Sequence, residues 1–195
     1  MIRICRYLQG TKDRGLRFKP IQNLILDCYV DADFAGLWNV ENSHDPISVK
    51  SRTGYVLTLG GCPLVWASKL QELVSLSTVE AEYIALSQSM RELLPLRCLL
   101  ISVCACLDLK PEETANTHST VFEDNNGALS LASSPGITPR TKHIAVKYHF
   151  FQSHCGPTKD VRIVKIESKE QKADIFTKGL AEQPFQHIRK LLMGW

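Results

Sequence analysis

Five short apolar segments, each bounded by turn-forming residues, constrain the fold of this chain more than any other feature. They span residues 24–31, 53–60, 62–68, 119–124 and 160–167. The second and third segments meet at Gly60-Gly61, which is typical of a β-hairpin. The first segment is apolar on both faces, as expected of a central strand. We therefore predict five β-strands.

Helical patterns separate and follow these strands. A capping box from Ser77 to Glu80 opens a helix that continues to about Leu109, with a kink or break at Pro95. Further helices are predicted over residues 125–134, 138–154, 168–180 and 184–192, and a basic helix within 1–20. The order predicts an α/β fold with a mixed five-stranded sheet. Three antiparallel strands precede two parallel ones, the fourth strand lies beside the first, and helices cover both faces.

Composition narrows the class of protein. The 195 residues suffice for one domain, and 44% apolar with 22% charged residues is typical of a globular protein. A net charge of +3 is compatible with a nucleic-acid partner. Seven cysteines without a CxxC pair predict reduced thiols and an intracellular location. No secretory signal and no membrane-spanning segment of about 18 apolar residues is expected.

Four acidic residues stand in four separate local contexts. Asp31 and Asp124 each close a predicted strand, in VDADF and VFEDNNGAL. Glu82 and Asp174 each lie early in a predicted helix, in LSTVEAEYIAL and QKADIFTK. Mg²⁺ prefers oxygen ligands and takes only a few from protein. If the fold brings these elements together, the four carboxylates predict a metal site that activates water.

Glu80 competes with Glu82 for a place in this site. Glu80 is the acidic member of the capping box on Ser77, which accounts for it without a metal. At about 100° per residue, Glu82 lies at the edge of the apolar helix stripe and Glu80 lies further round. We therefore expect Glu82 to point toward the sheet and Glu80 toward solvent.

Other acids also have alternatives. Asp33 shares a strand face with Asp31 and remains an alternative ligand. Glu123 points to the opposite strand face from Asp124, so the two are not expected to bind one ion. Taken alone, Asp124 is an ordinary helix cap and Asp174 an ordinary acid in a first helical turn.

Several longer motifs together resemble one family. They are YVDADFAG, SRTGYVLTLGGCPLVWASK, LSTVEAEYIALS, EDNNGALSLA, RTKHIAVKYHF and KADIFTKGL. Over residues of about 24–180, in the same order, they resemble the ribonuclease H domain of copia-type LTR retrotransposons. The leading RICRYLQGTKDRGLRF resembles the segment that joins such a domain to reverse transcriptase. The resemblance implies a remnant of that connection over 1–20, a ribonuclease H domain over 21–182 and a C-terminal amphipathic helix over 183–195.

The resemblance also implies an activity. It implies an endoribonuclease that hydrolyses the RNA strand of RNA–DNA hybrids during reverse transcription, leaving 5′-phosphate and 3′-hydroxyl ends. Two Mg²⁺, for which Mn²⁺ substitutes, would be held by Asp31, Glu82, Asp124 and Asp174. The expected partners are the hybrid and the reverse transcriptase domain of the same polyprotein. No membrane and no small-molecule cofactor are expected, and the expected location is a cytoplasmic virus-like particle.

Contacts to the hybrid are assigned to polar and basic residues near these motifs. Candidates for the 2′-hydroxyl or phosphates are Ser77, Asn125, Asn126, Arg140, Lys142, His143, Lys147, Lys69 and Lys178. Ser77, Asn125 and Asn126 also suit helix capping, and the basic residues also suit an ordinary solvated surface. Many members of the wider family carry a histidine in the loop before the last acid. The corresponding ESKEQK (167–172) has none, which leaves His143 as a partial substitute or a phosphate contact.

Three other functions remain open at this point. The long helix has no strongly basic protrusion to hold substrate, so the chain could be a catalytically weak or inactive module that binds nucleic acid or supports the polymerase. An integrase-like strand transferase would use three acids and would leave the ADIFTK motif without a role. A folded polyprotein spacer would leave all four acids unexplained.

Overall fold

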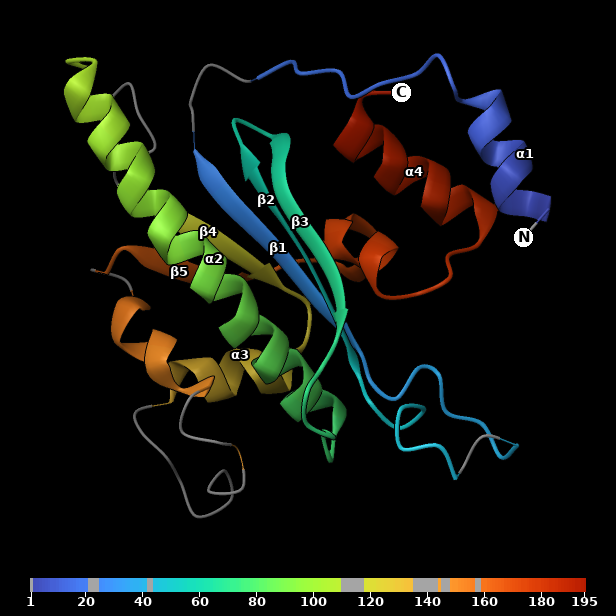
Figure 1. Ribbon diagram of the computed structural model, residues 1–195. Coiled ribbons are helices and arrows are strands. Elements are labelled where there is room, and N and C mark those ends of the chain that lie inside the picture. The colour runs from blue at the N-terminus through green and yellow to red at the C-terminus, as the bar shows by residue number, and fades with distance from the viewer. Residues whose placement is uncertain are drawn as a thin grey trace.

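A mixed five-stranded sheet forms the centre of the fold (Figure 1). The computed structural model describes residues 2–20, 25–41, 44–109, 118–134, 144, 148–156 and 159–195. The strands are β1 (Leu26–Asp33), β2 (Arg52–Leu59), β3 (Cys62–Leu70), β4 (Ser119–Glu123) and β5 (Val161–Lys165), in the order β3-β2-β1-β4-β5. Strands β1 to β3 are antiparallel, and β4 and β5 run parallel to β1. This arrangement confirms the predicted sheet, including the fourth strand beside the first.

Helices cover both faces of the sheet (Figure 1). The α-helices of the described residues are α1 (Ile2–Gly10), α2 (Thr78–Cys106), α3 (Asn126–Ser133) and α4 (Glu182–Met193). Short 3₁₀ helices are η3 (Phe150–His154), η4 (Ser168–Glu170) and η5 (Lys172–Phe176). Helices α2 and α3 pack on one face, and η5 with α4 packs on the other.

The strand alternation divides the apolar residues between two clusters. Leu26, Cys28 and Val30 of β1 are fully buried and pack in the cluster that contains Tyr83 of α2. Tyr29, on the opposite face of the same strand, packs in a second cluster with Val56 of β2 and with Ile188 and Leu192 of α4. Helix α4 is thus part of the packed structure, although 183–195 was predicted as a separate terminal segment.

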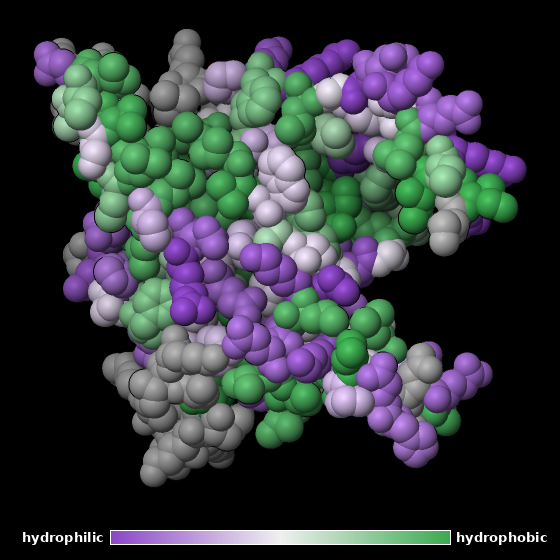
Figure 2. All heavy atoms as spheres, in the orientation of Figure 1, coloured by the Kyte–Doolittle hydropathy of each residue, from purple (hydrophilic) through white to green (hydrophobic). Residues whose placement is uncertain are grey.

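Helix α2 follows the predicted capping signal. The Ser77 hydroxyl accepts a hydrogen bond from Glu80 N at 3.2 Å. The helix continues through Pro95 to Cys106, so a break at Pro95 is not observed. Its far end exposes Leu99 and Val103, and Leu107 is exposed just after the helix. Hydrophobic residues gather over this end of α2, at upper left in Figure 2. Among the described residues, no helix combines the length and apolarity needed to cross a membrane.

Two predicted helices differ from the observed structure. Residues 168–180 do not form one helix but the two 3₁₀ helices η4 and η5, so that prediction was wrong. They are separated at Gln171, whose side-chain oxygen accepts from Ala173 N. Of the helix predicted over 138–154, residues 150–154 form a 3₁₀ helix, and most of the remainder lies outside the described residues.

The two ends of the chain pack against each other. Trp195 Nε1 donates to Gly15 O at 2.8 Å, and Arg17 N donates to Met193 O at 3.1 Å. Tyr7 of α1 packs edge-on against Phe185 of α4, with ring centroids 5.7 Å apart. The segment 1–20 therefore contacts α4.

Gly54 sets a close approach between β2 and η5. It pairs with Asp31 in the sheet, and an added Cβ would lie 2.5 Å from Thr177 Cγ2 and 2.9 Å from Phe176 Cβ. We expect Gly54→Ala to lower the free energy of unfolding by about 1–3 kcal/mol, because η5 must move away from the sheet. Urea denaturation measures this. Gly179→Ala, where a Cβ meets no atom within 4 Å, is the control, and equal effects of both variants would contradict the prediction.

Candidate metal centre

Three of the four predicted acids come together at one end of the sheet. Ligand oxygens of Asp31, Glu82 and Asp124 all lie within 4.8 Å of one another. Asp31 lies near the end of β1, Asp124 follows β4, and Glu82 is in the second turn of α2. Because β1 and β4 are parallel neighbours, their carboxyl ends lie at the same end of the sheet. These residues line an open cleft of about 430 Å³.

Burial in this cleft leaves one carboxylate oxygen without a protein partner. The side chains of Asp31 and Glu82 are 1% and 6% exposed. Glu82 Oε2 is buried and accepts no hydrogen bond from the described residues. A buried carboxylate oxygen is costly unless it is protonated or bound. Three carboxylates, one of which has a buried oxygen that accepts no hydrogen bond from the described residues, fit a hard divalent cation such as Mg²⁺.

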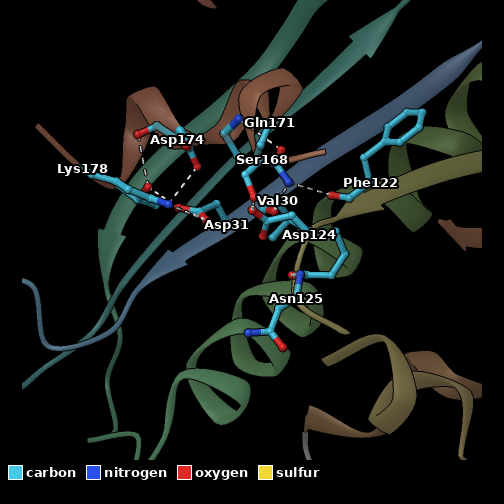
Figure 3. Close-up of polar contacts among 12 residues, drawn as sticks. Val30, Asp31, Phe122, Asp124, Asn125, Ser168, Gln171, Asp174 and Lys178 are labelled. Carbon is cyan, nitrogen blue, oxygen red and sulfur yellow. Dashed lines mark hydrogen bonds and ion pairs between the residues drawn. The ribbon is translucent and has the colours of Figure 1, made fainter. Parts of the chain in front are cut away.

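Asp174 lies beside this group and is connected to it by Lys178. Lys178 Nζ lies 3.0 Å from Asp174 Oδ1 and 3.3 Å from Asp31 Oδ1 (Figure 3). Asp174 is on η5, which packs against β1 and β2 from the face opposite α2. The structure therefore brings all four predicted acids to one region, three as a compact group and the fourth across a lysine.

The competing acids occupy distinct positions. Glu80 was expected to face solvent, but it is only 7% exposed, so that expectation was wrong. Its Oε2 accepts a hydrogen bond from Leu76 N at 2.8 Å, which ties its side chain to the segment before α2. Asp33 is partly exposed and lines the same cleft. Glu123 is fully buried, and its Oε1 accepts from Asn125 N at 2.9 Å.

Burial and mutual repulsion raise the pKa values of several of these carboxyls. Burial, followed by the charges of Glu123, Asp31 and Asp124, raises the pKa of Glu82 to about 10. Burial also raises the pKa of Glu123 to about 8 and that of Asp174 to about 6. Glu123 is thus part of the electrostatic environment, although it is not in the compact group. Without a cation, some of these carboxyls are protonated at neutral pH, so the site carries fewer negative charges than it has acidic residues.

Three polar side chains that sequence reasoning did not assign to the site hold the acids in place. The Thr177 hydroxyl donates to Asp31 Oδ2, and the Ser168 hydroxyl donates to Asp124 Oδ2 at 2.6 Å. Gln171 is fully buried, and its Nε2 donates to Val30 O at 2.9 Å and to Phe122 O at 3.3 Å (Figure 3). It therefore joins the segment that carries Asp174 to both strands that carry the other aspartates. No local sequence pattern identifies such roles, because each depends on a partner more than 40 residues away.

The residues predicted to contact nucleic acid have varied positions. Ser77 and Asn125 cap α2 and α3, and Asn126 Oδ1 accepts from Lys165 Nζ at 2.5 Å. Lys69 is exposed on β3, the edge strand of the sheet. Arg140, Lys142, His143 and Lys147 lie outside the described residues.

Sequence comparison finds related polyproteins. The chain is 34% identical to the retrovirus-related Pol polyprotein from transposon RE2 of Arabidopsis thaliana, over 96% of the chain and 12% of the relative. It is 35% identical to that from transposon TNT 1-94 of Nicotiana tabacum, over 97% of the chain and 13% of the relative. The chain thus spans about an eighth of the length of these curated relatives. No protein-family model matches it.

Comparison with solved structures finds ribonuclease H domains. LC11-RNase H1, isolated from compost, matches with a TM-score of 0.50 and 17% identity, over 78% of this chain and 92% of that one. The N-terminal RNase H domain of a Mycobacterium tuberculosis protein matches with a TM-score of 0.51 and 12% identity, over 84% and 98%. At this identity the likeness establishes the fold alone.

The raised pKa of Glu82 predicts how the stability of the metal-free protein depends on pH. Glu82 ionises near its ordinary pKa when unfolded, but only near pH 10 when folded. Its contribution to stability is therefore complete below pH 4.5 and is lost as pH rises through 10. In chelator at pH 8, we expect Glu82→Gln to raise the free energy of unfolding by about 1–3 kcal/mol. Thermal and urea denaturation from pH 5 to 9 measure this. Glu92→Gln, exposed on the same helix, should have no such effect, and a wild type whose stability rises across this range would contradict the prediction.

The Gln171 hydrogen bonds predict a second effect. We expect Gln171→Leu to lower the free energy of unfolding by about 2–4 kcal/mol, because two strand carbonyls lose their donor in a buried position. Urea denaturation measures this, and calorimetry should show weaker Mn²⁺ binding as η5 loosens. Gln186→Leu is the control, since the Gln186 side chain donates its hydrogen bond to Glu182 on an exposed helix face, away from the sheet. Unchanged stability in Gln171→Leu would contradict the role assigned to Gln171.

Proposed function

Because the chain is homologous to retrovirus-related Pol polyproteins from copia-type transposons and has the ribonuclease H fold, we propose that it is a metal-dependent endoribonuclease. Its substrate would be the RNA strand of RNA–DNA hybrids formed during reverse transcription, and its products would carry 5′-phosphate and 3′-hydroxyl ends. The reverse transcriptase of the same polyprotein would be its partner, in a cytoplasmic virus-like particle.

One observation carries this proposal. The oxygens of Asp31, Glu82 and Asp124 gather within 4.8 Å, and one oxygen of Glu82 is buried without a hydrogen-bond donor. A structural role does not require three acids in this arrangement, since the charges of Asp31 and Asp124 oppose ionisation of Glu82 and raise its pKa. A divalent cation accounts for both features, because it binds several carboxylates and occupies the free oxygen.

Two cations would be held by different subsets of the acids. Asp31, Glu82 and Asp124 would bind one, and Asp31 with Asp174 would bind the other. When bound, such ions supply an activated water and positive charge at the scissile phosphate and leaving oxygen. The protein's own residues supply orientation: Thr177 and Ser168 fix the carboxylates of Asp31 and Asp124 through hydrogen bonds.

The cleft is suited to a backbone phosphate rather than to an enclosed small molecule. It is open and lined mainly by polar residues, with Asn125 and Lys178 beside the acids. Asn125 Oδ1 already caps α3, so any contact to a 2′-hydroxyl would use its amide NH₂ group. Mn²⁺ should substitute for Mg²⁺, because the donor set is all oxygen.

The proposal predicts a cleavage activity that depends on the acids. We expect the wild type to cut the RNA strand of a labelled RNA–DNA hybrid in Mg²⁺ or Mn²⁺ but not in chelator. Asp124→Asn should reduce the rate by at least about 100-fold, since an amide oxygen is a much poorer ligand than a carboxylate. Gel analysis measures the rate and the chemistry of the new ends, beside duplex DNA and single-stranded RNA.

Asp108→Asn is the matched control, because Asp108 is exposed at the end of α2 and has a positive φ that Asn accepts. It should cleave like the wild type. Hybrid and metal binding without cleavage would favour the catalytically inactive module. A wild type that binds neither Mg²⁺ nor Mn²⁺ would contradict the metal centre itself.

A further inference from the structure

Lys178 places an ammonium group between two carboxylates of the candidate centre. Its Nζ lies 3.0 Å from Asp174 Oδ1 and 3.3 Å from Asp31 Oδ1, as Figure 3 shows. These are the two acids that would share the second cation. Lysine and cation would therefore occupy the same position.

The backbone builds Lys178 into this position. The amides of Thr177 and Lys178 both donate to Asp174 O, at 3.2 and 3.1 Å, so the chain folds back over Asp174 after η5. The Thr177 hydroxyl donates to Asp31 Oδ2, which leaves Oδ1 facing Lys178. Asp174 Oδ1 is buried, and among the described residues its polar partner is Lys178. Lys178 is thus held by its neighbours, unlike a solvated surface lysine.

The positive charge of Lys178 affects the pKa values of the neighbouring carboxyls. Burial opposes the charged form of Lys178, but Asp31 and Asp174 outweigh burial and hold its pKa above the ordinary value. In turn, Lys178 opposes the rise in the pKa of Glu82, which burial and three neighbouring acids produce. It has the same effect on the pKa of Asp33. In the metal-free protein, Lys178 therefore offsets part of the repulsion.

We propose that Lys178 is an exchangeable counter-cation, which bridges Asp31 and Asp174 in the metal-free protein and leaves when a divalent cation binds these two carboxylates. The inference rests on the proposed two-cation function. An ammonium and a divalent cation on the same two oxygens would repel each other strongly in a partly buried site. The Lys178 side chain is 40% exposed and has a flexible four-carbon stem, so it can turn outward to solvent.

This exchange would give the two cation positions different affinities. Lys178 contacts Asp31 and Asp174, but neither Glu82 nor Asp124 forms an ion pair with it. The position formed by Asp31, Glu82 and Asp124 is therefore open to a first ion. A second ion must displace the lysine, and its apparent affinity is its intrinsic affinity multiplied by the fraction of molecules in which Lys178 is turned away.

Calorimetric titration with Mn²⁺ tests the exchange in the full chain. Lys178→Met keeps most of the stem and removes the charge, and we expect it to bind the weaker Mn²⁺ equivalent about tenfold more tightly than the wild type. Lys178→Arg, which keeps the charge, should not gain affinity. Lys190→Met, on the exposed face of α4, should bind Mn²⁺ as the wild type does. In chelator, Lys178→Met should melt at a lower temperature than the wild type, and Mn²⁺ should raise its melting temperature by more.

A measurement on the wild type keeps the test decisive if Lys178→Met does not fold. The ¹⁵N-labelled Nζ resonance of Lys178, assigned by its loss in Lys178→Arg, should shift toward that of a solvated lysine when Mg²⁺ is added. An unchanged resonance at saturating Mg²⁺, or equal Mn²⁺ affinities in Lys178→Met and the wild type, would overturn the proposal. Cleavage by the wild type without these effects would refute the exchange alone, whereas the exchange without cleavage would refute only the proposed function.

Discussion

Repulsion among carboxylates at one end of the sheet is the constraint on which this site depends. Asp31, Glu82 and Asp124 are held within 4.8 Å even though burial raises the pKa of Glu82 to about 10. Glu82 cannot turn away, because its neighbours Ala81 and Tyr83 are fully buried in the main core. Burying an apolar side chain as large as Tyr83 contributes about 1.5–3 kcal/mol. Packing of α2 against the sheet thus opposes the electrostatic cost of placing a carboxylate there.

Hydrogen bonds from polar side chains position the remaining acid, Asp174. The segment between β5 and α4 carries Asp174 and has little regular helix. It is held in position by Gln171, Ser168 and Thr177, which donate hydrogen bonds to the strands and to their acids. Gln171 bonds to the carbonyls of Val30 and Phe122, one residue before Asp31 and two before Asp124. One buried amide therefore fixes the relative positions of three acids that come from three parts of the chain.

The sheet could be predicted from the sequence because its signals are local. Alternating apolar residues, the Gly60-Gly61 turn and the Ser77 cap each report on a few neighbouring residues, and they located the strands and the start of the long helix. The order of these elements along the chain then predicted the mixed sheet with β4 beside β1. The segment 168–180 was predicted as one helix because its composition favours one, yet tertiary hydrogen bonds to Gln171 divide it. The predicted orientation of Glu80 was wrong for a similar reason: helical phase takes no account of the hydrogen bond that the Leu76 amide donates to its side chain. The position of Lys178 between Asp31 and Asp174 likewise depends on residues from different elements, so no spacing rule reveals it.

A crowded acidic site can offset its negative charge in three ways, and the first two are visible in this structure. Some carboxyls hold protons at neutral pH, as the raised pKa values of Glu82 and Glu123 indicate. Lys178 supplies one positive charge from the chain itself. The proposed divalent cations are the third way, and they would displace both the protons and the lysine. Cation binding would therefore be coupled to proton release, and the apparent affinity for the ions would rise with pH. In the absence of cations, protons and Lys178 together offset the repulsion that the cations would otherwise offset alone.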